Sequence, residues 1–228
     1  MMRPKICVPV MEKNVKKAAS SVRLLDRHDP DLIELRFDLM KVASSFSMIR
    51  DATERPLIAT NRSRTQGGHF SGRPRERLET LMSAAREGFD YVDVELTSKD
   101  DRTVIQKVRE DGAEVIISHH NQRLTPAESV MRSILQKEKR AGADICKIVC
   151  TARNYRDSLR CLKFVEKHCT ETKLVCFCMG KHGISSRILS PILGGYFTFA
   201  SFRPGLETAP GQIPIDDLKS LYKELGVA

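Results

Sequence analysis

Short apolar runs of the kind that form buried β-strands recur along the whole chain at fairly regular spacing. Between most of them, apolar residues return every three or four positions, which is typical of one face of an amphipathic helix. The stripe Val15, Ala18, Val22 and Leu25 is an example. The pattern therefore predicts helices that alternate with strands, and the predicted strands are residues 6–10, 32–37, 57–60, 91–96, 114–118, 144–149, 173–178 and 196–200.

Eight strand–helix units favour an α/β fold, the single (β/α)₈ or TIM barrel, with residues 1–228 as one catalytic domain. The chain shows no linker and no low-complexity stretch that would divide it. An open, doubly wound sheet is the alternative, but no G-x-G-x-x-G motif follows the first strand. In a barrel, chemistry takes place at the C-terminal ends of the strands.

A capping motif marks the predicted start of one helix. The segment Thr125-Pro126-Ala127-Glu128 has the form of a capping box. Proline would then occupy the first helical position, where its missing N–H costs nothing. The motif predicts a helix that Thr125 caps.

Composition narrows the class of protein. Hydrophobic residues make up 41% of the chain, and no apolar run approaches the roughly 18 residues of a membrane span. The first residues lead directly into an apolar run, and the seven cysteines form no C-x-x-C motif. We therefore expect a cytoplasmic protein with reduced thiols and no membrane partner.

The formal charge of +9 permits nucleic-acid binding but does not require it. The basic residues are scattered, and there is no Trp to stack on bases. We expect no nucleic-acid partner and interpret the charge as a field that attracts an anionic substrate.

Lys147 lies in the middle of a strand-like apolar run and should face the interior. A buried ammonium must either pair its charge or give up its proton. A neutral, partly desolvated amine is the nucleophile that attacks carbonyl groups. His120 ends another apolar run, so the pair suggests carbonyl chemistry with proton abstraction.

Polar residues stand at or after the ends of most predicted strands. Several arginines, a lysine and an imidazole on one rim indicate a pocket for a small molecule that bears a carboxylate. These residues are Glu34, Arg36, Arg62, Asp93, Glu95, His119, His120, Lys147, Arg187, Thr208 and Gln212.

Each of these residues also has a structural interpretation. Glu34 and Arg36, two apart on one strand face, are candidates for an internal ion pair. An inward carboxylate such as Glu95 is a candidate to neutralise Lys147. His120 is a candidate for a core or capping histidine, and Arg187 for a surface loop. We expect no metal, because no Cys/His cluster has ligand spacing.

The chain resembles the type I 3-dehydroquinate dehydratases, the Schiff-base dehydratases of the shikimate pathway. The resemblance runs the whole length and consists of six short motifs in the family's order. They are ELRFD at 34–38, RSRTQGG at 62–68, SHHN at 118–121, ADICKI at 143–148, MGKHGISSR at 179–187 and APGQ at 209–212. Each motif alone is weak, but six in order are specific.

The resemblance implies a role for each matching position. Lys147 would form the Schiff base, His120 would be the general base, and Arg187 would hold the substrate carboxylate. The other substrate-binding positions are Glu34, Arg36, Arg62, Thr208 and Gln212. Gln212 belongs to the loop that would close the site after strand 8.

Two positions depart from the family pattern. The residue before the two glycines is usually glutamate and supports the histidine, but here it is Gln66. A neutral amide can still bind an imidazole, but it cannot raise the imidazole pKa by charge. Thr208 stands where serine is usual and keeps the hydroxyl.

The resemblance implies a hydro-lyase of aromatic amino acid and chorismate biosynthesis that acts as a homodimer without a cofactor. It would convert 3-dehydroquinate to 3-dehydroshikimate and water by syn elimination, with nearby arginine charge disfavouring the ammonium form of Lys147. Two alternatives stay open from the residues alone. They are a class I aldolase-type barrel acting on a sugar phosphate and a non-catalytic basic barrel that binds nucleic acid.

Overall fold

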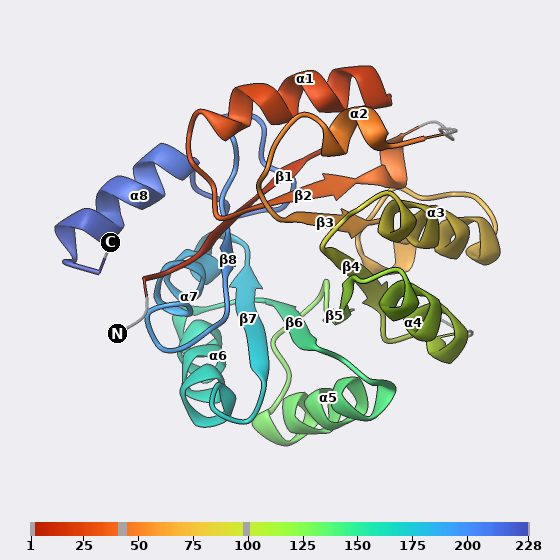
Figure 1. Ribbon diagram of the computed structural model, residues 1–228. Helices are drawn as coiled ribbons and strands as arrows, with labels where there is room; N and C mark the ends of the chain where they lie inside the picture. The colour runs from red at the N-terminus through yellow and green to blue at the C-terminus, as the bar shows by residue number, and fades with distance from the viewer. Residues whose placement is uncertain (1–2, 41–44, 98–100, 228) are drawn as a thin grey trace.

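Eight parallel strands form a nearly closed barrel in the computed structural model, which describes residues 3–40, 45–97 and 101–227 (Figure 1). The hydrogen-bonded order is β7-β6-β5-β4-β3-β2-β1-β8. Beside the gap between β7 and β8, Tyr196 N donates to Leu174 O over 2.8 Å. The strands are β1 Ile6–Val10, β2 Leu32–Arg36, β3 Leu57–Thr60, β4 Tyr91–Glu95, β5 Glu114–His120, β6 Ile145–Thr151, β7 Lys173–Met179 and β8 Thr198–Phe199.

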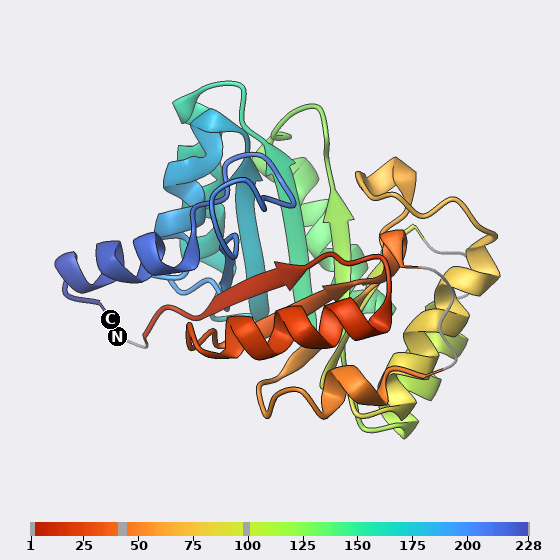
Figure 2. The same ribbon diagram turned by 90° about the horizontal axis from the view of Figure 1, so that it is seen from above.

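Helices surround the strands in both views of the molecule (Figures 1 and 2). The α-helices are α1 Val15–Asp26, α2 Ser47–Arg50, α3 Pro74–Arg86, α4 Asp101–Glu110, α5 Glu128–Ala141, α6 Tyr155–His168, α7 Ile184–Leu189 and α8 Ile215–Glu224. Three short 3₁₀ turns follow strands: η1 Phe37–Leu39, η2 Arg64–Gln66 and η3 Lys181–Gly183. The predicted (β/α)₈ barrel is confirmed. Of its predicted extent, residues 1–2, 41–44, 98–100 and 228 lie outside the described residues.

Strand ends differ from the predictions by up to two residues at each end. Strand β5 continues through His120, and β6 continues through Thr151. Strand β8 is only two residues long where five were predicted. The extension of β5 places His120 in regular extended backbone.

The predicted capping box before α5 is wrong. The helix begins at Glu128, after Ala127 in an extended conformation and without a side-chain cap. The Thr125 hydroxyl instead donates to Thr151 O over 3.1 Å and ties the loop to the end of β6. Side-chain caps are present elsewhere, where Asn14 caps the N-terminus of α1 and Asn154 caps that of α6.

Alternation along the strands separates two buried layers. On β6, Ile145 and Val149 pack in a cluster that fills the barrel, whereas Cys146 and Ile148 pack against helices. Successive side chains of a strand point to opposite faces. Lys147 therefore points into the barrel between two apolar neighbours. In the described parts of the chain, no helix is long and apolar enough to cross a membrane.

Candidate active site

A cavity of about 590 Å³, partly open to solvent, lies where the C-terminal halves of the strands meet the loops that follow them. Nine of the residues predicted for the site line it: Glu34, Arg36, Arg62, Gln66, His120, Lys147, Arg187, Thr208 and Gln212. Asp93, Glu95 and His119, which were also predicted on this rim, are not among its lining residues. The cavity also has an apolar wall that was not predicted, formed by Val149, Phe177, Met179 and Phe199. Strand alternation is the signal for three of these, because Val149, Phe177 and Met179 share a face with other inward residues.

Lys147 is buried and its charge is paired. Its Nζ lies 2.9 Å from Asp93 Oδ2 and 3.4 Å from Glu34 Oε1. The ring of Phe199 lies beneath it, with its centre 4.5 Å away. Of the two states expected for a buried lysine, the geometry shows the paired one. The carboxylates, rather than arginines, are therefore its charged contacts.

The expected pairing of Lys147 with an inward carboxylate is confirmed, but Glu95, the example given for it, is not the partner. Glu95 accepts from Ser63 N over 2.8 Å and contacts the guanidinium groups of Arg62 and Arg77. Two arginines and a backbone amide thus hold this carboxylate at the outer side of the network. Asp93, two residues earlier on the same strand face, contacts the lysine in its place.

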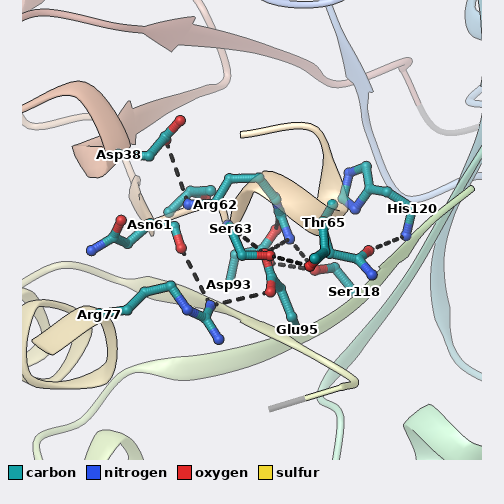
Figure 3. A network of polar contacts seen from close by, with 12 residues as sticks. Asp38, Asn61, Arg62, Ser63, Thr65, Arg77, Asp93, Glu95, Ser118 and His120 are labelled. Atoms are coloured by element: carbon teal, nitrogen blue, oxygen red, sulfur yellow. Dashed lines mark hydrogen bonds and ion pairs between the residues drawn. The ribbon is translucent and has the colours of Figure 1, made fainter. Parts of the chain in front are cut away.

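Arg62 is the centre of this polar network (Figure 3). It donates to Asp93 Oδ2 and to Ser118 Oγ, each over 2.7 Å. Burial favours the neutral form of Arg62, but Asp93 and Glu95 outweigh it and raise the pKa of the guanidinium. Arg62 is therefore a permanent cation in the wall of the cavity.

His120 ends β5 at the edge of the same network (Figure 3). Burial, together with the charges of Arg62 and Lys147, lowers the pKa of its imidazole well below 6.5. Asp93 opposes this shift without cancelling it. The ring is neutral near neutral pH, and its Nδ1 has no hydrogen-bond partner among the described residues. A neutral imidazole is able to accept a proton.

Gln66 supports the histidine in a way that the sequence did not indicate. Its side-chain oxygen accepts from the backbone N–H of His120 over 2.7 Å. Gln66 was expected to bind the imidazole of His120, but its side-chain oxygen binds the backbone N–H of His120 instead. Gln66 therefore positions the end of β5.

The suggested internal ion pair between Glu34 and Arg36 is also wrong. Arg36 makes two hydrogen bonds of 2.8 Å to the carboxylate of Asp38. Glu34 accepts from Thr60 Oγ1 over 2.8 Å and contacts Lys147. Each side chain thus has its own partner, and both border the cavity.

Arg187 is buried on the short helix α7, so the surface-loop interpretation is wrong. Its guanidinium stacks on the ring of Phe177, 4.4 Å from the ring centre. One long hydrogen bond of 3.4 Å reaches Phe199 O. In the described chain, Nε and Nη2 have no partner, and burial lowers the pKa to about 10. A buried cation with two free donors on a cavity wall fits an anionic ligand.

Thr208 and Gln212 lie in the loop after β8 and bind each other. Thr208 N donates to Gln212 Oε1 over 2.7 Å, and Gln212 Nε2 donates to Thr208 Oγ1 over 3.2 Å. The loop lies beside the end of β7, where Gly180 N donates to Pro210 O over 3.0 Å (Figure 2). At Gly211, with φ of 82°, a Cβ would come within 2.7 Å of Gly180 O. Only glycine suits this close approach.

Comparison with known proteins agrees with the geometry. The family model of type I 3-dehydroquinase matches residues 6–228. The 3-dehydroquinate dehydratase of Methanothermobacter thermautotrophicus is 37% identical over 227 residues, which is 98% of each chain. That of Methanococcoides burtonii is 33% identical over 227 residues, covering 95% of this chain and 92% of the relative.

Solved structures give the same result. The 3-dehydroquinate dehydratase of Geobacillus kaustophilus superimposes with a TM-score of 0.91 at 28% identity, covering 98% of this chain and 91% of that one. The type I enzyme of Clostridium difficile, solved with covalent modified comenic acid, gives 0.88 at 27% identity, with 99% and 93% coverage. This chain therefore belongs to the type I 3-dehydroquinase family and is an enzyme of the hydro-lyase class.

Proposed function

We propose that this enzyme converts 3-dehydroquinate to 3-dehydroshikimate and water through an imine on Lys147. The observation that carries the proposal is one cavity that holds a buried lysine, a neutral imidazole and a buried arginine with free donors. Those groups fit a nucleophile, a base and a carboxylate clamp. Neither the sugar-phosphate aldolase nor the nucleic-acid-binding barrel gains support from the family match.

The chemistry begins at the C3 ketone. Lys147, after it yields a proton, attacks this carbon, and loss of water leaves a protonated imine. The iminium withdraws electrons and acidifies the C2 hydrogens. His120 removes one of them, and the C1 hydroxyl leaves as water with a proton from His120, on the same face. Hydrolysis of the imine frees Lys147.

The arginines and the loop after β8 position the substrate. Arg187 would bind the carboxylate with its two free donors, Nε and Nη2. Glu34, Arg36 and Arg62 would face the ring hydroxyls, and Thr208 with Gln212 would close the cavity above them. This orientation would bring the C2 hydrogen to His120.

The reaction needs no cofactor in this proposal, because the lysine imine itself is the electron sink. We further propose that the enzyme works in the cytoplasm as a homodimer, in the shikimate pathway of chorismate and aromatic amino acid biosynthesis. Neither a nucleic acid nor a membrane is a partner in this account. The small-molecule substrate is 3-dehydroquinate.

Turnover of 3-dehydroquinate tests the proposal. The conjugated product absorbs in the ultraviolet, so purified enzyme should produce a steady rise in absorbance. Lys147→Ala should abolish the rise, and His120→Ala should reduce it by at least about a hundredfold. Wild-type enzyme that leaves 3-dehydroquinate unchanged would refute the assignment.

A further inference from the structure

Asp93 is a fully buried carboxylate in the barrel wall with three partners inside the barrel. Its Oδ2 accepts from Arg62 over 2.7 Å and from Lys147 over 2.9 Å. Its Oδ1 accepts from the Ser118 hydroxyl over 2.5 Å. The side chain lies behind Lys147 rather than among the residues that line the cavity. A substrate in the cavity would therefore meet the lysine first and leave the Asp93 contact in place.

The surroundings of Asp93 keep it ionised. Burial alone raises the pKa of a carboxyl, but here Arg62 and Lys147 outweigh burial and hold the pKa of Asp93 far below its usual range. Arg62 also keeps its own charge, as shown above. Asp93 is therefore a fixed negative charge and is unsuited to exchange protons during turnover.

The charge on the lysine nitrogen is conserved across imine formation. An ammonium and a ketone give a protonated imine and one water, so the nitrogen bears one positive charge before and after the step. The first proton leaves the nitrogen so that its electron pair can attack the carbonyl carbon. In all, two protons pass from the nitrogen to the oxygen that leaves as water. A fixed anion beside the nitrogen favours both cationic states.

We propose that Asp93 is the counter-ion of the protonated imine on Lys147. This inference rests on the proposed function, because it assigns a role within that reaction. The carboxylate 2.9 Å from Nζ stabilises the iminium against loss of its proton and so preserves its electron-withdrawing form. Arg62 and Ser118 hold the carboxylate at that position.

Several other ionisable groups lie around Lys147 and Asp93, and each is in a different position from that of a counter-ion. Glu34 is the second carboxylate near Nζ, but at 3.4 Å it is farther away and borders the cavity, where substrate would compete for it. Glu95 is bound by arginines and does not contact the lysine. Among the described residues, the further ionisable groups that act on this region from neighbouring strands and from α5 are Cys7, Arg36, Arg62, His120 and Glu138.

Reductive trapping across a pH range tests the proposal. Cyanoborohydride reduces protonated imines, so the covalent mass gained with 3-dehydroquinate reports the iminium. In Asp93→Asn the cation loses its neighbouring charge, and trapping should decline at a pH lower by about one unit or more. At a fixed alkaline pH this corresponds to a yield at least about tenfold below wild type.

Glu95→Gln is the matched control, because it removes a charge from the same strand face and the same arginine network without touching Lys147. We expect this variant to keep the wild-type pH dependence. If Asp93→Asn also keeps it, or if both variants shift equally, the counter-ion role is overturned.

A third variant covers misfolding of Asp93→Asn, which circular dichroism would reveal. Ser118→Ala removes the hydroxyl that binds Oδ1 but leaves the carboxylate charge. We expect an acid shift of less than about one unit, because the carboxylate keeps its charge but is held less firmly beside Nζ. An unchanged pH dependence in this variant would overturn the counter-ion role. Failure of the wild-type enzyme to be trapped would refute the proposed function instead, so the two failures are distinguishable.

Discussion

At the scale of single residues, the site contains ionisable side chains whose burial disfavours their charged forms. Arg187 is 1% exposed and has two donors free, and His120 is a neutral ring among cations. Neither state benefits an isolated protein, since buried polar groups are normally satisfied. In the proposed reaction, the substrate supplies a carboxylate to Arg187 and a proton to His120.

The pH dependence of activity should reflect the low pKa of His120. The base works when neutral, so kcat/KM declines only as the pH falls through that pKa, well below 6.5. Gln66→Glu places a negative charge beside His120 and should raise its pKa, moving the acidic limb up by about one unit. His119→Gln, at the neighbouring ring outside the cavity, is the control that should leave the limb in place. Identical acidic limbs for wild type and Gln66→Glu would contradict this account.

Substrate binding should depend on the shape of the Arg187 side chain as well as its charge. Arg187→Lys keeps a positive charge but loses the planar pair of donors. We expect KM for 3-dehydroquinate to rise by about ten- to a hundredfold, with thermal stability retained. Arg75→Lys, at an exposed position of α3, is the matched control. An unchanged KM in Arg187→Lys would remove Arg187 from carboxylate recognition.

At the scale of elements, helix α5 buries a carboxyl that the reaction does not use. Glu138 is fully buried against β6, and neither of its oxygens forms a hydrogen bond of ordinary geometry among the described residues. Burial, followed by the charge of Asp93, raises the pKa of Glu138 well above 4.5. The carboxyl is therefore neutral in the folded state over a range of pH where the unfolded chain ionises it.

This carboxyl should make stability fall with rising pH. The pKa of Glu138 is higher in the folded state than the value near 4.5 in the unfolded chain. The loss of stability from this group is therefore absent below pH 4.5 and grows as the pH rises toward the folded-state pKa. Glu138→Gln should stabilise the protein at neutral pH by about 1–3 kcal/mol and flatten this slope. Glu128→Gln, at an exposed site of the same helix, should leave the slope above pH 4.5 unchanged, because Lys167 lowers the pKa of Glu128 and its contribution is lost only below that value. Thermal unfolding over a pH series measures these slopes. Equal slopes for wild type, Glu138→Gln and Glu128→Gln would contradict the burden assigned to Glu138.

Strand alternation made much of the site predictable. The inward face of β6 was evident from a lysine in an apolar run, and two-residue spacing placed Glu34 and Arg36 on one face. Partner choice was not predictable, because long side chains reach several neighbours. In the structure, Asp93 binds Lys147 and Asp38 binds Arg36. The wrong prediction of a capping box before α5 has the same cause. The Thr125 hydroxyl binds Thr151 O in the tertiary structure and does not cap the helix.

At the scale of the whole molecule, the nearly closed ring of parallel strands assembles the site. Lys147 and Glu34 are 113 residues apart in sequence, yet their charged atoms are in contact. The sequence predicted the barrel because eight strand-like runs alternate with helical stripes. It did not predict the gap between β7 and β8 or the shortness of β8, which depend on how the barrel closes.

The proposed mechanism requires a covalent imine between Lys147 and 3-dehydroquinate. The most direct measurement is borohydride reduction of the enzyme during turnover, followed by peptide mass spectrometry. We predict one added substrate-derived mass, located on Lys147, and none in Lys147→Ala. An unmodified Lys147 under turnover conditions, or the same mass on another residue, would contradict the account.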